Sequence, residues 1–206
     1  MKKIITLALL VLTTGVTQAQ NTDKAKKLLN EVAAKVKSYN NVVLDFTYTY
    51  NGNSNSGKVA IEGDKYVASL MGITQIYDGS KLYTINPEDE EITVSKNNGS
   101  DAVTPSKVLT FFNSGYTYSW DIQQKTGGKN IQYIKLKPTS SKSSTKEILL
   151  GIDSSTKQVY NKIEVCKNGS RSTLTVNSFK TNQPLGSGYF SFNASKYPNY
   201  YINAID

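Results

Sequence analysis

The chain contains no histidine and a single cysteine, and these absences exclude several classes of function. Without histidine, neither a Ser-His-Asp nor a Cys-His nucleophilic site can form, and the usual zinc sites lose their common nitrogen ligand. Cys166 has no second cysteine to pair with, and its place in an apolar run predicts a small buried residue rather than a reactive thiol. We therefore expect a protein that is not an enzyme, with no catalytic residues, no metal site and no cofactor.

Arginine is nearly absent as well: among the 24 basic residues, Arg171 is the only arginine. The formal net charge of +8 would suit an anionic partner such as nucleic acid or a phospholipid surface. Nucleic-acid readers rely on arginine for bidentate contacts with bases, however, and the lysines of this chain are scattered singly. A basic but otherwise ordinary surface is the better interpretation, with no nucleic acid as a partner.

The longest apolar run, Ile4–Leu12, is too short to span a bilayer. It follows Lys2 and Lys3 and precedes the small-x-small sequence Thr17-Gln18-Ala19, which together are typical of a secretory signal peptide. We expect residues 1–19 to be this signal, cleaved after Ala19, and residues 20–206 to form a single domain in the periplasm. Because Gln20 is not a cysteine, a lipid anchor is not expected. The alternative is that the segment is retained as a membrane anchor.

The mature chain is expected to begin with a helix and to continue mainly as strands. Apolar residues recur at helical spacing over Thr22–Tyr39, with lysine and glutamate on the far side. In Val42–Tyr50 the apolar residues alternate strictly, which predicts a sheet with one apolar, aromatic side and one wet side. A polar turn is expected over Asn51–Ser56, and Asp78-Gly79 predicts a hairpin turn.

Alternation and turn residues predict strands along most of the remaining chain. They are expected around Val59–Ile61, Tyr66–Leu70, Ile73–Tyr77, Lys81–Ile85, Ile92–Val94, Tyr116–Gln124, Ile131–Lys137, Ile148–Ile152, Val159–Cys166 and Thr173–Phe179. A second, short helix is expected from Thr104-Pro105 to Phe112. The acidic tetrapeptide Glu88–Glu91 lacks the glycine and the spacing of a calcium loop and is interpreted as a solvated hairpin tip. The fold class is mainly β, a half or full antiparallel barrel of about 10–11 strands with two helices.

Several motifs follow one another in an order and spacing that resemble a known family. After the signal and the first helix come the aromatic strand Val42–Tyr50, the glycine-started strand Gly57–Ile61 and the Gly63–Tyr66 tetrapeptide. The most recognisable segment, Asp78–Pro87, begins D-G-x-x-L and ends in proline. A Thr-Pro helix follows, and the chain closes with an F-x-F strand, Phe190-Ser191-Phe192, near Tyr197-Pro198. In this order the chain resembles the outer-membrane lipoprotein carrier family, LolA.

The resemblance implies a periplasmic carrier whose incomplete antiparallel β-barrel has a concave apolar face covered by the N-terminal helix and the short mid-chain helix. Such a protein holds the acyl chains of a lipoprotein released by an inner-membrane transporter and passes it to an outer-membrane acceptor. It is expected to act as a monomer. Family members carry an arginine before the third strand that latches the lid. The corresponding position here is about Gly63-Asp64, so any latch in this chain must be different.

The residues expected to line the cavity and its lid are apolar or aromatic, because acyl chains need apolar contact and little else. They are Leu28, Leu29, Val32, Leu44, Phe46, Tyr48, Val59, Ile61, Tyr66, Ala68, Leu70, Val108, Leu109, Phe111 and Phe112. Pattern alone favours helices that fill an ordinary core, since amphipathic helices commonly pack on sheets, and the family resemblance reverses this preference.

Two other functions compete with lipoprotein transport. One is a related, non-enzymatic binding module or sensor for other lipids or amphiphiles. The other is a hydrolase that uses carboxylates such as Glu62, Asp64 and Asp78, because paired carboxylates can hydrolyse glycosides. These acids fall in predicted turns and hairpin tips, which argues against a cleft built from them.

Overall fold

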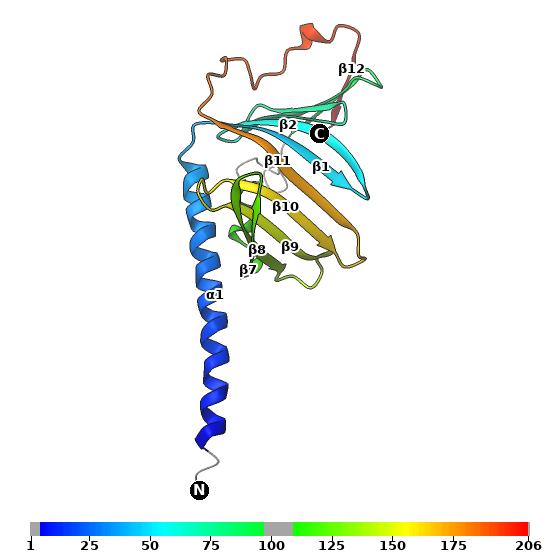
Figure 1. Cartoon of the computed structure of the whole chain (residues 1–206). Helices are drawn as coiled ribbons and strands as arrows, with labels where there is room; N and C mark the ends of the chain where they lie inside the picture. The colour runs from blue at the N-terminus through cyan, green and yellow to red at the C-terminus, as the bar shows by residue number, and fades with distance from the viewer. Residues whose placement is uncertain (1–4, 97–108, 206) are drawn as a thin grey trace. The chain divides into compact units, whose positions relative to one another are not determined.

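The computed structural model describes the backbone of residues 5–96 and 109–205, and the side chains of these ranges from residue 20 onward (Figure 1). The elements are α1 (Ile5–Lys37), β1 (Val42–Tyr50), β2 (Asn53–Glu62), β3 (Lys65–Leu70), β4 (Ile73–Tyr77), β5 (Lys81–Asn86), β6 (Glu91–Lys96), η1 (Phe111–Asn113), β7 (Tyr116–Thr126), β8 (Lys129–Pro138), β9 (Thr145–Asp153), β10 (Val159–Cys166), β11 (Arg171–Thr181), η2 (Ala194–Lys196) and β12 (Tyr201–Ile205).

The strands follow the order β12-β6-β5-β4-β3-β2-β1-β11-β10-β9-β8-β7, and the sheet is not closed into a ring. This open arrangement of twelve strands confirms the predicted class of an incomplete β-barrel, with one or two strands more than expected. The additional strand is β12, which pairs with β6 in parallel, whereas the other pairs described are antiparallel.

Contacts divide the chain into two compact units. Unit 1 comprises Met1–Ala34 and Phe112–Arg171, and unit 2 comprises Lys35–Phe111 and Ser172–Asp206. Each unit is described by itself below. The expected single domain over residues 20–206 stays a prediction.

The strands of unit 2 pair in a register that places every second side chain on the same face. One row runs through Leu44, Val59 and Ala68, and the next row runs through Val43, Ala60 and Val67. We call the face with Leu44 and Val59 the inner face, and the face with Val43 and Ala60 the outer face. The alternation expected for β1 is therefore confirmed, because Val42, Leu44, Phe46 and Tyr48 fall on one side.

The outer face of unit 2 is covered by the segment that follows β11, which we call the C-terminal cover (residues 185–200). Phe190 and Leu185 pack with Val43, Ala60 and Val67. The residues that pack around Ile76, Ile85 and Ile92 include Phe192, Tyr197 and Tyr200. The Phe192 ring stacks on Tyr83, with 4.5 Å between ring centroids, and Tyr197 stacks on Phe192 at 5.8 Å.

This cover corrects two expectations. The side of the sheet predicted to be wet is apolar over β2–β6, where Ala60, Ile76, Ile85 and Ile92 are buried. The predicted F-x-F strand is wrong, because Phe190 to Phe192 lie in turns and use their rings to cover the sheet. Strands in which neighbouring residues are both apolar, such as Leu82 with Tyr83 in β5, are the sequence signal for burial on two faces.

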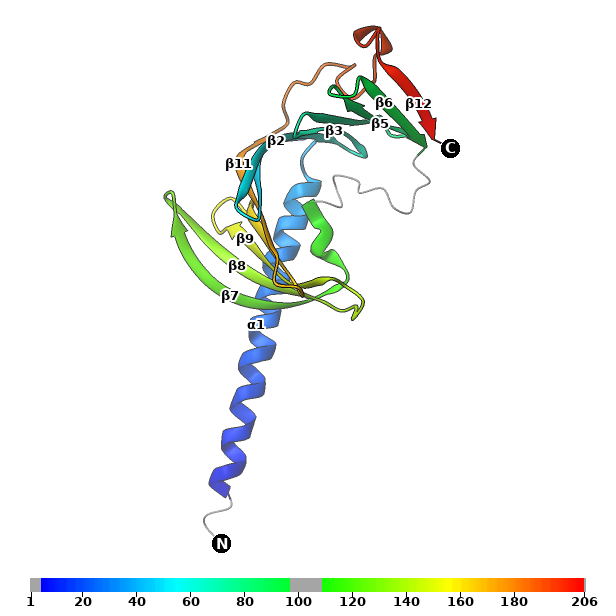
Figure 2. The same ribbon diagram turned by 90° about the vertical axis from the view of Figure 1, so that its right-hand side faces the viewer.

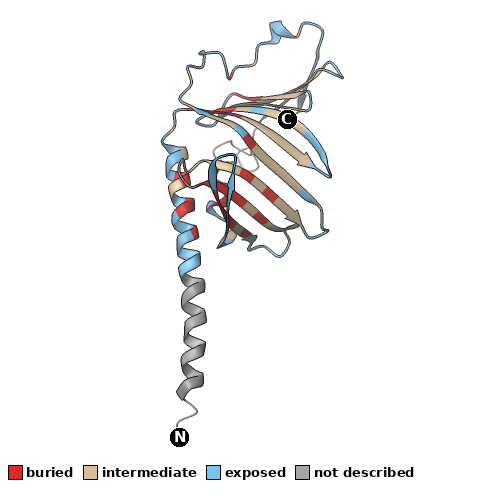
Figure 3. Cartoon of the chain, in the orientation of Figure 1, coloured by how far each residue is buried: buried red, intermediate tan, exposed pale blue. Residues whose placement is uncertain are grey.

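In unit 1, strands β7 to β10 form an antiparallel sheet with two different faces. One face carries Ile134, Leu136, Ile148, Leu150 and Ile152, all at most 1% exposed. The other carries a cluster built from Ile131, Tyr133 and Ile163 with Leu149 and Tyr160, all of them sheet residues. The buried stripe of α1, namely Ala25, Leu28, Leu29 and Val32, therefore packs on the first face, which we call the helix-side face (Figure 3).

Two contacts fix α1 to its own sheet. Thr22 Oγ1 donates to the Tyr118 carbonyl at 3.4 Å, and Glu31 pairs with Lys157 of the β9–β10 turn at 3.1 Å. The helix begins at Ile5 and ends at Lys37, so the expected start at Thr22 and end at Tyr39 are wrong. Residues 5–12 of the apolar run belong to this same helix. Cleavage after Ala19 stays a prediction. Among the residues that the structure describes, no helix is both long and apolar enough to cross a membrane.

Several strand and turn predictions are confirmed, and others need correction. Strands β1, β4 and β10 have the expected bounds. The predicted turn over Asn51–Ser56 is shorter, because β2 begins at Asn53 and pairs with Tyr50. Cys166, expected to be buried, is half-buried at the end of β10. The mid-chain helix is described only from Leu109 onward (Figure 2), so Thr104, Pro105 and Val108 lie outside the described residues.

The C-terminal cover is expected to contribute strongly to stability. Replacing Phe190, which is 6% exposed, by alanine should lower the free energy of unfolding by about 3 kcal/mol or more, since it opens a cavity over Val43 and Ala60. Chemical denaturation measures this loss. Tyr189→Ala is the control, because Tyr189 is 38% exposed and should lose much less. Equal losses in the two variants would contradict the assigned packing.

Candidate functional site

A pocket of about 190 Å³ lies in unit 2 between the inner face and the segments that cover it. Its walls come from the end of α1 and the following residues, from the start of β1, from the end of β2, and from Leu109 and Thr110. The lining residues are Val36, Lys37, Tyr39, Asn40, Asn41, Val42, Ile61, Gly63, Leu109 and Thr110. The volume is below the roughly 300–1,000 Å³ of typical ligand pockets, so the described state is nearly closed.

The floor of this pocket is the apolar inner face of the sheet. Val42, Leu44 and Ile61 are each at most 6% exposed and form one cluster with Leu109 and Val176. The half-buried residues packed against the cluster are Val36, Tyr39, Val59, Tyr66, Leu174 and Phe179. Within unit 2, both covering segments thus pack on the inner face. Their role as a lid stays a prediction.

Among the described residues, Leu109 and Val36 pack on the part of the inner face formed by β1, β2 and β11. Farther along the sheet, Ala68 and Leu70 of β3, and Ile73 of β4, remain half-buried. At the other end of β1, Phe46 and Tyr48 are also half-buried. The inner face therefore extends as an apolar strip beyond the pocket.

Phe46 occupies the space that a missing side chain leaves in this strip. Gly57 lies between Phe46 on β1 and Leu70 on β3 in the paired register. A β-carbon at Gly57 would come within 2.4 Å of the Phe46 ring, so the ring lies directly over the glycine. Gly57 thus makes room for the Phe46 ring, which a side chain at this position would displace.

The residues after α1 are fastened to the segment just after β11 by amide hydrogen bonds, which we call the Asn41 staple. The Asn41 side chain donates to the Gln183 carbonyl and accepts from the Gln183 N–H, both at 2.8 Å. Asn41 is 7% exposed, and its own carbonyl accepts the Asn182 N–H. The Asn40 N–H donates to the Asn182 side chain at 2.8 Å, and Tyr39 packs edge-on against Phe179. These contacts hold Val36 and Tyr39 over the inner face.

Gly63, at the position expected for the family's latching arginine, lines the pocket and has open space beside it. Gly63 has a φ of +56°, and nothing lies within 4 Å of the place its β-carbon would occupy. A side chain with a β-carbon is strained in this conformation, so the β2–β3 turn favours glycine here. The Asn41 staple, not an arginine, fastens this end of the helix.

Tyr66 and Tyr77 place two phenol groups on the inner face. They are paired across β3 and β4, with ring centroids 5.8 Å apart. Burial raises the pKa of Tyr66 above its usual value, and the neighbouring Tyr77 raises it further. Tyr66 is therefore a neutral hydroxyl at physiological pH, and it adds no charge to the apolar strip.

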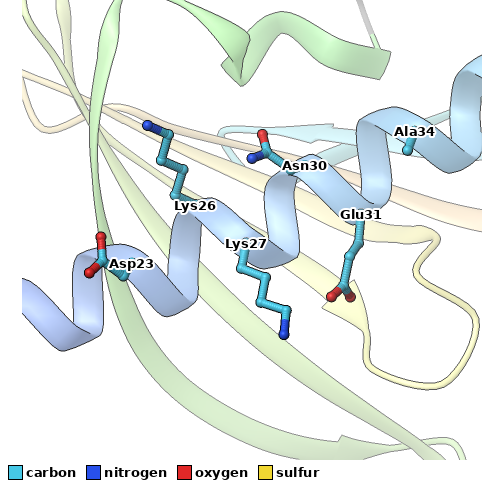
Figure 4. A pocket seen from close by; sticks show the side chains of 6 residues that line it. All are labelled: Asp23, Lys26, Lys27, Asn30, Glu31 and Ala34. Atoms are coloured by element: carbon cyan, nitrogen blue, oxygen red, sulfur yellow. The ribbon is translucent and has the colours of Figure 1, made fainter.

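A second hollow, of about 460 Å³, lies along α1 in unit 1 (Figure 4). Its lining residues are Asp23, Lys26, Lys27, Asn30, Glu31 and Ala34. Apart from the half-buried Glu31 they are exposed, whereas Leu28 and Leu29 on the other side of the helix are buried. This hollow is an open helix surface whose lining residues are mostly charged and exposed to solvent, so it does not enclose a ligand.

The structure brings together some of the predicted site residues and leaves others in unit 1. In unit 2, Leu44, Ile61 and Leu109 meet in one cluster, and Val59 and Tyr66 pack against it. The half-buried members on the inner face are Phe46, Tyr48, Ala68 and Leu70, and Phe111 of η1 is half-buried as well. The predicted residues that belong to unit 1 are Leu28, Leu29, Val32 and Phe112, all buried. Val108 lies outside the described residues.

Sequence reasoning missed the residues that complete the pocket. Val36 and Tyr39 continue the helical pattern, and Val42 continues the alternation of β1, so the signal for them was present. Val176 and Phe179 come from β11, whose register could not be read from the sequence. Asn41 was interpreted only as part of the helix end. Its side-chain amide bonds to a backbone as a neighbouring strand would, and no sequence pattern indicates such a contact.

The acidic residues considered for catalysis or metal binding lie in turns or at the ends of strands. The Asp78 carboxylate accepts the N–H groups of Ser80 and Lys81 and so fixes the Asp78-Gly79 hairpin. Glu62 and Asp64 are exposed. Glu88, Asp89 and Glu90 are exposed at the β5–β6 hairpin tip, as predicted. In the described ranges, no three His, Cys, Asp or Glu residues are grouped so that they could hold a metal ion.

Removing the Asn41 staple should loosen the helix end. Asn41→Ala leaves both polar groups of the Gln183 backbone without their partner, and we expect a loss of about 1–3 kcal/mol in unfolding free energy. Hydrogen exchange should also rise in residues 36–41. Asn40→Ala is the control: Asn40 is exposed and its N–H stays in place, so a change within about 0.5 kcal/mol is expected. If Asn41→Ala resembled this control, the staple would not hold the helix end.

Comparison with known proteins supports the geometric interpretation. The sequence family described as outer membrane lipoprotein carrier protein LolA matches residues 72–193. Comparison with curated proteins gives no significant match.

Among solved structures, an uncharacterized conserved protein from Thermus thermophilus is similar, with a TM-score of 0.62 and 6% identity over 87% of this chain and 98% of that one. The lipoprotein LppX of Mycobacterium tuberculosis has a TM-score of 0.49 and 14% identity, with 78% and 98% covered. A DUF1329 family protein from Desulfovibrio piger has a TM-score of 0.47 and 10% identity, with 86% and 99% covered.

The Thermus likeness supports the fold, and the family match covers more than half of the chain. The matched family is one of carrier proteins, not of enzymes, and its fold is of a lipid-binding carrier type. The match includes β4 to β6 and all strands from β7 to β11. The chain belongs to the outer membrane lipoprotein carrier protein LolA family.

Proposed function

We propose that this protein is a periplasmic, non-enzymatic carrier that binds the acyl chains of lipoproteins and ferries them from the inner to the outer membrane. The observation that carries the proposal is the inner face of unit 2, an apolar strip that Val36, Tyr39 and Leu109 cover only in part. The family match gives this face its cargo class, because the family is one of lipoprotein carriers.

The strip suits acyl chains because its contacts are apolar and lack a fixed charge. Each buried methylene contributes about 0.8 kcal/mol, so a long chain binds by the sum of many weak contacts. Leu70, Ala68 and Phe46 offer such contacts without any change in the lid.

Cargo uptake requires the lid to move. The pocket of about 190 Å³ is too small for a lipid anchor while Leu109 and Val36 contact the cluster. Displacing these residues exposes Leu44, Ile61 and Val42, so cargo contacts replace lid contacts on the same surface. Such an exchange keeps the apolar surface covered in both states and makes release possible.

The partners follow from this role. They are lipidated lipoproteins as cargo, a lipoprotein-releasing transporter at the inner membrane and an acceptor at the outer membrane. The carrier works as a monomer after its signal peptide, residues 1–19, has been removed. The alternative remains a related binding module or sensor for other lipids, since the same apolar strip accepts any long acyl chain.

Capture of cargo tests the role directly. The protein is exported to the periplasm of a Gram-negative host, purified without detergent and analysed by mass spectrometry. We expect stoichiometric lipidated lipoprotein and a carrier whose first residue is Gln20. Free lipids without any lipoprotein would contradict the transport role and support the binding module, and absence of both would contradict the apolar strip as a binding site.

A charge on the strip should weaken binding. Leu70 is half-buried on the inner face, so Leu70→Lys should reduce the affinity for a palmitoylated peptide at least about tenfold, because the chain would have to desolvate an ammonium group. Displacement of a fluorescent apolar probe measures the affinity. Ser69→Lys adds the same charge one residue away on the opposite face and should leave binding unchanged. Equal effects of the two substitutions would place the acyl chain elsewhere.

A further inference from the structure

The inner face of unit 2 changes from apolar to polar along one row of directly paired residues. The members of this row on β1, β2 and β3 are apolar, and those on β4, β5, β6 and β12 are polar and uncharged. In strand order they are Leu44, Val59, Ala68, Gln75, Thr84, Thr93 and Asn203. Because directly paired residues point to the same side of a sheet, all of them share the inner face. We call the part from Gln75 to Asn203 the polar row.

Most of the polar row lies where β5, β6 and β12 run side by side at one edge of the sheet (Figure 2). On β5 and β6, the apolar side chains of Ile85 and Ile92 are buried on the outer face, where the C-terminal cover packs. Thr84 and Thr93 are their neighbours in the sequence and therefore point to the inner face. At the level of this row the inner face is thus amphipathic, with the apolar strip continued by polar groups.

The threonine hydroxyls of the polar row are available to a ligand. Elsewhere in unit 2, the directly paired hydroxyls of Ser69 and Thr74 bond to each other at 3.0 Å. Thr84 and Thr93 are paired in the same way, but neither hydroxyl has a hydrogen-bond partner among the residues that the structure describes. The same holds for the side chain of Gln75, and all three side chains are half-buried. Such hydroxyl and amide groups can both donate to and accept from a bound molecule.

The last member of the row is oriented by a neighbouring carboxylate. Asn203 Nδ2 donates to Glu91 Oε1 at 3.3 Å, and Asn203 is paired with Thr93 across β12 and β6. Glu91 is half-buried and precedes Thr93 by two residues, so it lies on the inner face as well. Its negative charge disfavours an anionic group beside the row, because like charges repel. The chemistry of the row therefore fits a ligand group that is polar and uncharged.

We propose that the polar row binds the uncharged head of an amphiphile whose acyl chain lies on the apolar strip, a head with hydroxyl, ester or amide groups. The inference rests on the proposed function, because it takes the acyl chain on the strip as given and assigns the site of its head. Neighbouring strands are about 4.8 Å apart, so Thr84 lies about 10 Å along the sheet from Ala68 and about 19 Å from Leu44. A chain lying across β1 to β3 thus places its head over β5 and β6.

Two ligands with the same chain and different heads test the row. The exported protein is titrated with 1-monopalmitoylglycerol, whose head has free hydroxyl groups, and with methyl palmitate, an ester that has none. We expect the Thr84→Val/Thr93→Val double variant to bind monopalmitoylglycerol about tenfold more weakly, as for the loss of two neutral hydrogen bonds, without weaker binding of methyl palmitate. Valine keeps the branched shape that suits a strand. Thr74→Val is the control, because Thr74 is a half-buried threonine on the outer face, and both affinities should stay unchanged.

Spin labels test the orientation of the bound amphiphile without any substitution. 4-Palmitamido-TEMPO carries its nitroxide on an uncharged amide head, and methyl 16-doxylstearate carries it near the end of the chain. We expect the head label to broaden the amide resonances of Thr84 and Thr93 most strongly, and the chain label to broaden those of Leu44 and Val59. The reverse order, or equal broadening by the two labels, would overturn the head site.

The outcomes separate this inference from the proposed function. If both ligands bind and the double variant weakens both equally or neither, the head site is overturned while the carrier role stands. If neither ligand binds to the unmodified protein, the carrier role and the head site fail together. Circular dichroism shows whether each variant is folded, and the spin labels decide the matter if the double variant does not fold.

Discussion

The sheet of unit 2 has two apolar faces, and each needs its own cover. The outer face is covered by rings that follow β11 in the chain, with Phe192 stacked on Tyr83 and Phe190 packed against Val43 and Ala60. The inner face is covered by Val36, Tyr39 and Leu109, which come from the end of α1, the residues after it and the segment before η1. A permanent cover on one side allows the other side to be opened without loss of the sheet, because half of its apolar surface stays buried throughout.

The lid depends on few contacts at its hinge. The Asn41 staple reproduces strand pairing with a side chain, and it fixes where the chain passes from helix to β1. A glycine with positive φ at position 63 leaves the neighbouring wall open. In this chain the helix end is therefore held by amide hydrogen bonds and an aromatic contact. These contacts carry no charge, and breaking them costs less free energy than breaking a buried ion pair.

Local patterns in the sequence predicted the strands well, and they predicted the covers poorly. Ile73–Tyr77 was bounded correctly because glycine and Asp-Gly turns flank a short alternating run. The polar start of β2 was missed since Asn53 and Ser54 join a strand only through pairing with Tyr50 and Thr49. The aromatic residues of the C-terminal cover were assigned to a strand, because their packing on the outer face leaves no periodic pattern in the sequence. The pairing of β11 with β1 contains a register shift that no local sequence pattern encodes.

The central claim is that acyl chains replace the lid on the inner face of unit 2. Intermolecular nuclear Overhauser effects between a protonated palmitoyl chain and methyl-labelled protein measure this most directly. We expect cross-peaks to Leu44, Ile61 and Leu70 on the inner face, and none to Ile76 or Ile85 under the C-terminal cover. Cross-peaks confined to the outer face, or none to any methyl group of unit 2, would contradict the account.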